Sequence, residues 1–293
     1  MSADVIPSET RAVTAGSTPD RYCVVGNPVA HSRSPWIHAA FARLTGESIE
    51  YDRLQVPLDG FVDGLRAFAA SGGKGCNVTV PFKFEAAGFA HRLTDRALLA
   101  GAANTLRFET DGIHADNTDG AGLVADIERN AGVPLAGATL LLVGAGGASA
   151  GALGPLVAAA PARLVVVNRT PARAEALVER HAAWARACGT VLEAMPIAAL
   201  AESFDIVVNA TSSSLEGGGI PVPPLVLRPG TLALDMMYGP ASRPFLSWAQ
   251  RYGAVPRDGL GMLVEQAAEA FRFWRGVQPP TQDVLAALRA ETA

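Results

Sequence analysis

The chain has 293 residues, of which 49% are hydrophobic and 18% charged, enough to bury the cores of one or two domains. Its formal net charge is −4 and no run of Lys or Arg occurs, which argues against a nucleic acid partner because phosphate binding needs a concentrated basic face. Cys23, Cys76 and Cys188 are scattered, with no CxxC pair, so we expect a reducing compartment and neither a disulfide framework nor a metal site.

Two segments, residues 131–162 and the N-terminal residues 1–19, do not indicate membrane insertion. Residues 131–162 carry no charge, but Gly and Pro interrupt them throughout, whereas a spanning helix needs about 20 mostly apolar residues in succession. Residues 1–19 are polar and lack an apolar signal core. We therefore expect a disordered tail on a cytoplasmic protein that has no membrane partner.

Short apolar strands alternate with helices through the first part of the chain. Strands are predicted at 22–26, 49–55, 75–80, 103–109 and 113–116, and helices at 35–44, 58–70 and 95–100, followed by a longer helix at about 120–130. Alternation of this kind predicts parallel strand pairing in an α/β unit.

A second alternation begins at Thr139 and predicts a second α/β unit. Its strands are expected at 139–143, 163–167, 190–193, 205–209 and 231–235, and its helices at 148–159, 172–188 and 243–251. Two last helices, 260–275 and 281–290, have no sheet of their own. The predicted fold class is α/β with two domains and an active-site cleft between them: a discontinuous domain of residues 20–118 and 260–293, and a Rossmann-type domain of residues 119–259.

A glycine-rich turn links the first strand of this second unit to its first helix. Gly144 permits the tight turn, Gly146 lets the backbone approach a pyrophosphate, and the helix that follows offers free N–H groups. Because the third position of G-x-G-x-x-G is Ser149, a purely structural turn remains the alternative. The expected dinucleotide site comprises Gly144, Ala145, Gly146, Gly147 and Ala148.

The end of the next strand indicates which dinucleotide is bound. An NAD-preferring site has an acidic residue here, which accepts a hydrogen bond from the ribose 2′-hydroxyl. This chain has Asn168, Arg169, Thr170 and Arg173 instead, and two guanidiniums with a hydroxyl suit a 2′-phosphate. The alternative is that the two arginines are solvated helix residues. The position of these residues at the end of the second strand favours binding of a 2′-phosphate, so the expected cofactor is NADP(H).

Several polar residues lie where strands end or helices begin. Ser32 and Ser34 precede a helix, where two hydroxyls suit a carboxylate, and Ser34 is also expected to cap that helix before Pro35. Three other residues of this set have a structural alternative: Lys83 as a surface lysine, Asn104 as a turn amide and Asp119 as a helix cap. Ligands of open α/β sheets bind at the carboxyl ends of the strands, which favours a common site. The further members of this set are Thr79, Lys83, Asn104 and Asp119.

Nine segments together give the chain a specific resemblance. It is similar to the shikimate dehydrogenase family over about Tyr22 to Gly276, through GNPVAHSRSP, NVTVPFK, GAANTL, DNTDG, GAGGAS, NRTPARA, NATSSS, LDMMYGP and DGLGMLVEQAAEAF. The resemblance implies reversible reduction of 3-dehydroshikimate to shikimate by NADPH, in chorismate and aromatic amino acid biosynthesis. It implies small-molecule partners and a monomer or a homodimer.

The resemblance also implies a role for each matching residue. Lys83 would be the proton donor in reduction and the acceptor in oxidation, and Asp119 would hold it. Substrate contacts would come from Ser32 and Ser34 to the carboxylate, from Thr79 and Asn104 to ring hydroxyls, and from Tyr238 and Gln266. Met236 and Gly259 would lie near the nicotinamide, and Thr211 and Ser212 would line the cofactor cleft.

Two alternatives stay open from the sequence. The first is a quinate/shikimate dehydrogenase, or a relative that acts on an aminated shikimate. Thr at position 34 and Asp near position 168 would favour quinate and NAD. This chain has Ser34 and Asn168 at these positions. The second is a non-catalytic ligand-binding regulator on the same fold, because fold does not fix function. Such a regulator would be expected to lose Lys83 or Asp119, and both are present.

Overall fold

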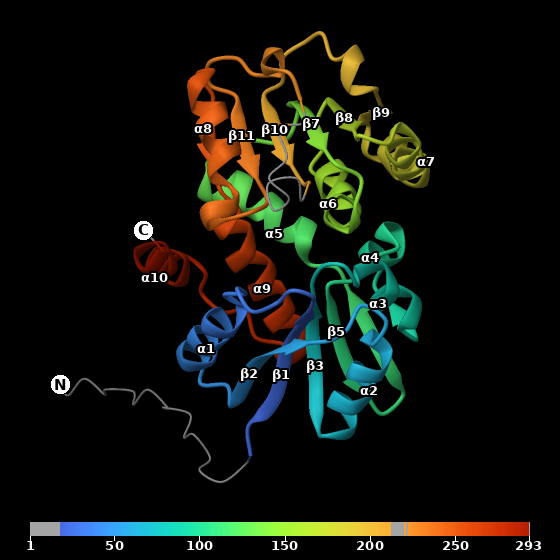
Figure 1. Ribbon diagram of the computed structural model, residues 1–293, viewed down its shortest axis with the longest axis vertical. Helices are drawn as coiled ribbons and strands as arrows, with labels where there is room; N and C mark the ends of the chain where they lie inside the picture. Colours follow the sequence, from blue (N-terminus) through green and yellow to red (C-terminus); the bar gives the residue numbers. More distant parts are fainter. Residues whose placement is uncertain (1–17, 212–219, 221, 293) are drawn as a thin grey trace, which may run out of the picture.

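The computed structural model describes residues 18–211, 220 and 222–292, which form two six-stranded sheets with helices packed around them (Figure 1). The α/β class is therefore confirmed. Most of the predicted tail, residues 1–17, and the predicted cofactor residue Ser212 lie outside the described residues. No helix in the described part of the chain is long and apolar enough to cross a membrane.

The first sheet has the strand order β2-β1-β3-β5-β6-β4. Its strands are β1 (Asp20–Gly26), β2 (Ile49–Gln55), β3 (Gly73–Val78), β4 (Arg92–Leu93), β5 (Thr105–Glu109) and β6 (Gly112–Asp116). Its helices are α1 (Ser34–Thr45), α2 (Phe61–Ala70), α3 (Lys83–Phe89) and α4 (Asp95–Ala100). The sequence did not indicate α3 or the two-residue strand β4.

The expectation of parallel pairing throughout is wrong for β5, which runs antiparallel to both β3 and β6. The physical reason is a tight hairpin: Glu109 pairs with Gly112, and this glycine has φ 130°, a backbone conformation that other residues rarely adopt. Because of this reversal, the start of β5 lies at the same edge of the sheet as the ends of β3 and β6. Asn104, which precedes β5, therefore faces the same region as residues that follow β3 and β6.

The expected cap of helix α1 is also wrong. Arg33 holds the N-cap position with helical dihedral angles, and Ser34 is already the first helical residue. The hydroxyl of Ser32 instead accepts a hydrogen bond from the Ser34 backbone N–H at 3.2 Å. Ser32 thus satisfies one of the free donors at the start of the helix, a role that the sequence analysis gave to Ser34.

The second sheet is fully parallel, with the order β12-β11-β10-β7-β8-β9 of a doubly wound dinucleotide-binding fold. Its strands are β7 (Thr139–Val143), β8 (Arg163–Val167), β9 (Val191–Ala194), β10 (Ile206–Asn209), β11 (Leu232–Asp235) and β12 (Val255–Arg257), and its helices are α6 (Gly147–Ala158), α7 (Pro171–Cys188) and α8 (Arg243–Arg251). The sequence did not indicate β12, whose central residue is Pro256; proline is tolerated only because this is an edge strand.

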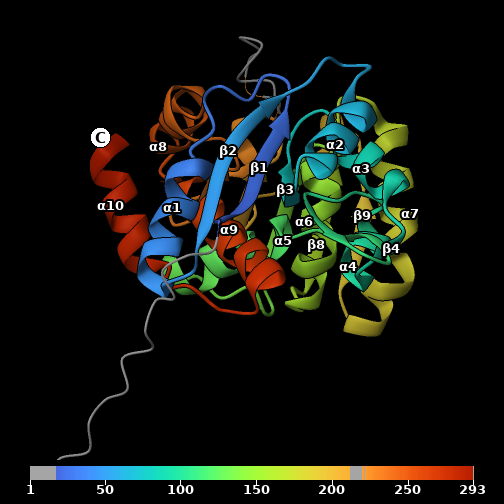
Figure 2. The ribbon, with the colours of Figure 1, turned by 90° about the horizontal axis from the view of Figure 1, so that it is seen from below.

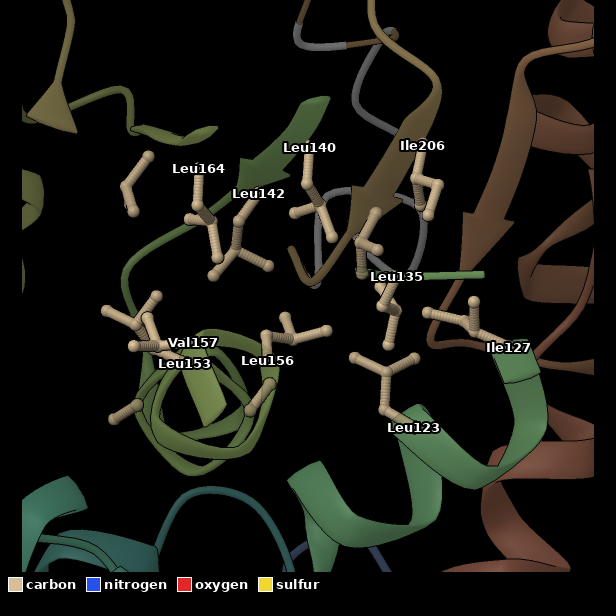
Figure 3. Packing of buried hydrophobic residues seen from close by; sticks show 14 of the residues in the cluster. Leu123, Ile127, Leu135, Leu140, Leu142, Leu153, Leu156, Val157, Leu164 and Ile206 are labelled. Atoms are coloured by element: carbon tan, nitrogen blue, oxygen red, sulfur yellow. The ribbon is translucent and has the colours of Figure 1, made fainter. Parts of the chain in front are cut away.

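Helix α5 (Asp119–Ala125) packs its apolar side onto the parallel sheet (Figure 3). Leu123 of α5 and Ile127, just beyond it, belong to the same buried cluster as Leu140 and Leu142 of β7 and Leu156 of α6. The helix predicted at 120–130 is interrupted, because residues Asp126–Asn130 form a π-helical turn. Helix α5 thereby links the residue at its start to the core of the second unit.

The last two helices, α9 (Leu260–Arg275) and α10 (Gln282–Thr292), return to the first unit. Phe41 and Ile37 of α1 share a buried cluster with Val264 and Phe271 of α9 and Leu288 of α10, and Figure 2 shows α10 beside α1. Helix α9 also packs along α5, between the two sheets (Figure 1). The division of the chain into domains at residues 118 and 259 stays a prediction.

A buried ion pair connects the π-helical turn, strand β12 and helix α9. The carboxylate of Asp126, which is fully buried, accepts hydrogen bonds from Arg257 Nε at 2.8 Å and Nη2 at 2.5 Å, and from Asn130 at 3.1 Å. A Cβ added to Gly261 of α9 would lie only 1.7 Å from Asp126 Oδ1. The helix can approach the ion pair only because this position has no side chain.

We expect Gly261→Ala to lower the free energy of unfolding by about 3 kcal/mol, since it displaces one partner of a buried ion pair. Gly88→Ala is the matched control, because a Cβ at this other helical glycine would meet no atom within 4 Å. The control should change stability by less than about 1 kcal/mol. Urea unfolding measures both variants, and equal stabilities would contradict the packing argument.

Candidate active site

A buried ion pair between two helix starts forms the centre of the site. Lys83 Nζ donates to Asp119 Oδ2 at 2.6 Å, and the side chains are only 13% and 6% exposed. Asp119 is the first residue of α5, where a negative charge is favoured by the helix dipole, but Lys83 is the first residue of α3, where a positive charge is disfavoured. Local helix stability therefore does not explain the lysine. The surface-lysine alternative does not fit, because the ammonium is held inside the protein.

Asn104 connects this ion pair to the rest of the site. Its amide nitrogen donates to Asp119 Oδ1 at 2.8 Å and to Gln266 Oε1 at 3.2 Å, and its amide oxygen accepts from the Thr118 backbone N–H at 2.8 Å. A carboxylate can only accept and a backbone N–H can only donate, so these contacts fix the orientation of the amide. Lys83, Asp119, Asn104 and Gln266 are thus brought into one hydrogen-bonded network.

The predicted carboxylate site lies at the start of α1. Arg53 of β2 donates to the Ser32 carbonyl oxygen at 2.6 and 3.1 Å and so fixes the serine segment. Tyr238 packs against the buried cluster that contains Ile37 and Phe41 of α1, and burial raises the pKa of its hydroxyl while the charges of Arg33 and Arg53 oppose this rise. Sequence reasoning missed Arg53, and its positive charge suits a carboxylate ligand.

Thr79 lies one residue beyond the end of β3, beside the end of the neighbouring strand β1. Its backbone N–H donates to the Val25 carbonyl at 2.9 Å, and a Cβ added to Gly26 would lie 2.3 Å from its Cγ2. Gly26 is therefore required for Thr79 to approach the end of β1. The Thr79 carbonyl also accepts a hydrogen bond from the Phe82 backbone N–H at 3.1 Å, so the threonine begins the turn that leads into α3.

The glycine-rich turn lies directly against the substrate-side residues. A Cβ added to Gly147 would be 3.3 Å from Lys83 Cβ, and one added to Gly151 of α6 would be 2.4 Å from Asn117 Oδ1. Asn117 in turn accepts a hydrogen bond from the Asp119 backbone N–H at 3.2 Å. The start of α6 is thus in contact with both loops that carry the ion pair. Sequence reasoning missed Asn117, although it lies in the DNTDG segment.

The predicted cofactor residues follow the ends of neighbouring parallel strands, and therefore lie along one edge of the sheet. Gly144 has φ 113°, and a Cβ there would be 3.2 Å from the Ala210 backbone, so both its conformation and its surroundings require glycine. Within the described residues, helix α6 begins without a side-chain cap, which suits binding of a pyrophosphate by its first N–H groups. The segments along this edge are residues 144–148 after β7, 168–173 after β8, Thr211 after β10 and Met236 after β11.

The residues after β8 fit a 2′-phosphate. Arg169 and Arg173 are exposed, and neither forms an ion pair with any carboxylate in the described part of the chain. Asn168 donates to the Thr170 carbonyl at 2.9 Å, which shapes the turn that presents both guanidiniums. The free donors and the absence of an acidic residue at Asn168 fit NADP better than NAD.

A second buried carboxylate supports the expected nicotinamide end. Burial raises the pKa of Asp235 to about 6, against the opposing effect of hydrogen bonds from the Met237 N–H and from Asn209. The Asn209 amide nitrogen donates to Asp235 Oδ2 at 3.2 Å, which joins the ends of β10 and β11, and its amide oxygen accepts from Thr211 Oγ1 at 2.8 Å. A Cβ added to Gly259 would lie 2.3 Å from the carbonyl oxygen of Met236. Met236 and Gly259 are thus neighbours, and sequence reasoning missed Asn209 and Asp235 behind them.

Comparison with known proteins agrees with this arrangement. Three family descriptions match the chain: "Shikimate dehydrogenase substrate binding domain" over residues 24–106, "Shikimate / quinate 5-dehydrogenase" over 127–216 and "Shikimate 5′-dehydrogenase C-terminal domain" over 259–289. The NADP(+) shikimate dehydrogenase of Acidovorax sp. (strain JS42) is 65% identical over 274 residues, which are 94% of this chain and 97% of the relative.

Solved structures extend the likeness to the fold. The Ael1 enzyme from Pseudomonas putida has a TM-score of 0.83 at 46% identity, covering 92% of this chain and 98% of that one. Shikimate 5-dehydrogenase from Thermus thermophilus, solved in complex with NADP(H) and shikimate, has a TM-score of 0.80 at 31% identity, covering 92% and 99%. The chain belongs to the shikimate dehydrogenase family.

Proposed function

We propose that this chain is an NADP⁺-dependent shikimate dehydrogenase, which reversibly reduces 3-dehydroshikimate to shikimate. The observation that carries the proposal is the buried Lys83–Asp119 pair, held by Asn104 and in contact with the glycine-rich turn at Gly147. A proton donor and a dinucleotide-binding turn side by side are what a carbonyl reductase requires. The family relatives supply the identity of the substrate and the cofactor.

In the proposed mechanism, bound NADPH supplies the hydride and Lys83 supplies the proton. The Lys83 ammonium would stabilise negative charge on the carbonyl oxygen of the substrate and then donate a proton to that oxygen. In the reverse direction the neutral amine accepts the proton of the hydroxyl. Asp119 holds the ammonium in place, and Asn104 and Thr79 orient ring hydroxyls, so that proximity contributes to the rate.

The proposed substrate carboxylate lies at the start of α1, between the Ser32 and Ser34 hydroxyls, with Tyr238 and Arg53 nearby. A serine at position 34 favours shikimate over quinate, which carries an additional hydroxyl beside its carboxylate. Gln266, which accepts from Asn104, completes the wall of the site on α9. The proposed substrate-binding unit is residues 20–118 with 260–293, and the proposed NADP-binding unit is residues 119–259.

We further propose that this chain is a cytoplasmic monomer or homodimer that acts on small molecules and binds neither nucleic acid nor membranes. Its three cysteines are free, which suits a reducing compartment, and Cys23 and Cys76 are buried. The negative net charge of −4 provides no basic surface for nucleic acid. The place in chorismate biosynthesis follows from the proposed reaction.

Absorbance at 340 nm, recorded with purified protein and NADP⁺, tests the substrate. We expect a strong signal with shikimate and at least about tenfold lower kcat/KM with quinate, because one misfitted polar group costs about 1.4 kcal/mol or more. A stronger signal with quinate would favour the quinate/shikimate alternative. No signal with shikimate, quinate or an aminated shikimate would favour the non-catalytic alternative.

Replacement of Lys83 tests the mechanism. Lys83→Ala should lower kcat for shikimate by about 10²–10⁴-fold, the usual contribution of a general acid–base group. Lys83→Arg should stay at least about 10²-fold below the wild type, because a guanidinium keeps the charge but cannot exchange its proton near neutral pH. Lys74→Ala on β3 removes the other lysine of the chain and should have no effect. Activity of Lys83→Ala within tenfold of the wild type would exclude the role.

Arginine replacement after β8 tests the cofactor preference. Arg169→Ala should raise KM for NADP⁺ by about 10- to 100-fold, the value of a charge-assisted bond to phosphate, and leave KM for NAD⁺ nearly unchanged. Arg186→Ala is the control, since this exposed arginine lies in the last turn of α7, the helix that begins two residues after Arg169. If the ratio of NADP⁺ to NAD⁺ efficiency were the same in wild type and Arg169→Ala, the 2′-phosphate assignment would be wrong.

A further inference from the structure

A chain of polar side chains lies behind the site, on strands β2, β3 and β5. The Tyr51 hydroxyl donates to Asn77 Oδ1 at 2.7 Å, and the Asn77 amide nitrogen donates to Thr105 Oγ1 at 3.0 Å. The Thr105 hydroxyl donates to Asn104 Oδ1 at 2.9 Å. Asn77, Thr105 and Asn104 are all buried, so these groups depend on one another for hydrogen bonds rather than on water.

The surrounding contacts fix the direction of every bond in this chain. The Asn77 nitrogen also donates to the Asn104 backbone carbonyl at 3.2 Å, which can only accept, so the oxygen of Asn77 must face Tyr51 and accept from it. Asn104 Oδ1 also accepts from the Thr118 backbone N–H, so Thr105 must be a donor to it. The bonds therefore run in one direction, from Tyr51 through Asn77 and Thr105 to Asn104.

The same direction continues into the catalytic pair, because the Asn104 nitrogen donates to Asp119 Oδ1 and Lys83 donates to Asp119 Oδ2. Hydrogen bonds aligned in this way polarise one another inside a protein, and each fixes the position of the next group. The Tyr51 hydroxyl is the first donor of the chain and lies three hydrogen bonds from Asn104.

The ring of Tyr51 is held independently of its hydroxyl. It stacks on His38 with ring centroids 4.2 Å apart and an angle of 9°, and it lies 6.2 Å from Trp274. His38 is fully buried, and burial lowers its pKa to about 3, so it forms a neutral surface under the ring. Removal of the hydroxyl alone would leave these ring contacts in place.

We propose that Tyr51 is a positioning residue, whose hydroxyl acts through Asn77 and Thr105 to hold Asn104 against Asp119 and so keep Lys83 aligned for proton transfer. Tyr51 touches none of the reacting atoms in this proposal. The proposal rests on the proposed function, because it assigns the proton transfer to Lys83. No motif in the sequence pointed to Tyr51, which follows Ile49 and Glu50 in an otherwise ordinary strand.

The test is Tyr51→Phe compared with Tyr22→Phe. Tyr22 is the register partner of Tyr51 on β1 and stacks on the same Trp274 at 4.5 Å, but its hydroxyl faces Arg275, away from the site. Both variants should lose a few degrees of Tm, as expected for one hydroxyl. Only Tyr51→Phe should lower kcat for shikimate, by about three- to tenfold, the value of one neutral hydrogen bond, while KM for NADP⁺ stays within about twofold.

Thr105→Val supplies a second measurement, because it interrupts the chain at the residue that donates directly to Asn104. It should lower kcat to a similar degree, and the double variant with Tyr51→Phe should fall no further than the larger single effect, since both remove the same path. Thr105→Val alone carries the test if Tyr51→Phe does not fold.

Three outcomes would overturn the proposal: a kcat of Tyr51→Phe equal to that of Tyr22→Phe, a Thr105→Val variant with wild-type kcat, or single effects that multiply in the double variant. Lys83→Ala is measured in the same series. If Lys83→Ala is inactive while Tyr51→Phe behaves like Tyr22→Phe, the proposed function stands and only the role of Tyr51 is wrong. If Lys83→Ala retains activity, the proposed function fails first.

Discussion

The carboxylate of Asp119 is the group on which the arrangement of the site depends. One oxygen accepts from Lys83 and the other from Asn104, at 2.6 and 2.8 Å, and the carboxylate is almost fully removed from water. Transfer of such an ion pair out of water costs several kcal/mol per ion, which close geometry and additional hydrogen bonds must offset. Asn104 provides the additional bond. The reversed direction of β5, which the hairpin at Gly112 produces, brings Asn104 to the edge where Lys83 and Asp119 lie.

Helices α5 and α9 fix this centre relative to both sheets. Asp119 begins α5, whose Leu123 packs under the parallel sheet, while Gln266 belongs to α9, which packs on α1 of the first unit. The two helices touch so closely that a Cβ at Gly122 would lie 2.6 Å from the Gln266 backbone. A small shift between the helices would therefore move Asp119 relative to Gln266 and Asn104. Helix α6 packs equally closely on α5, since a Cβ at Gly120 would lie 2.5 Å from the Gly151 carbonyl oxygen, and the glycine-rich turn at its start lies beside Lys83.

The cofactor side was more predictable than the substrate side for a physical reason. Strands β7 and β8 have the predicted bounds 139–143 and 163–167, because a strand buried on both faces is a continuous apolar run and the turns that follow carry local signals. The substrate side depends on strand direction and on contacts between distant segments, which local pattern does not encode. The start of α3 at Lys83 was missed because Pro81 ended the strand pattern, and Ser34 was given a cap position that Arg33 holds.

The scarcity of lysine in the chain is a signal that Lys83 is present for its chemistry rather than for stability. Of the 24 Lys and Arg residues in the chain, only Lys74 and Lys83 are lysines, so arginine occupies nearly every position that needs a positive charge. At position 83 an arginine could also pair with Asp119, even bidentately, but it could not release its proton near neutral pH. The helix dipole at the start of α3 disfavours any positive charge there. A lysine at this position, held by Asp119 and 13% exposed, therefore suits the proton transfer that we propose for it.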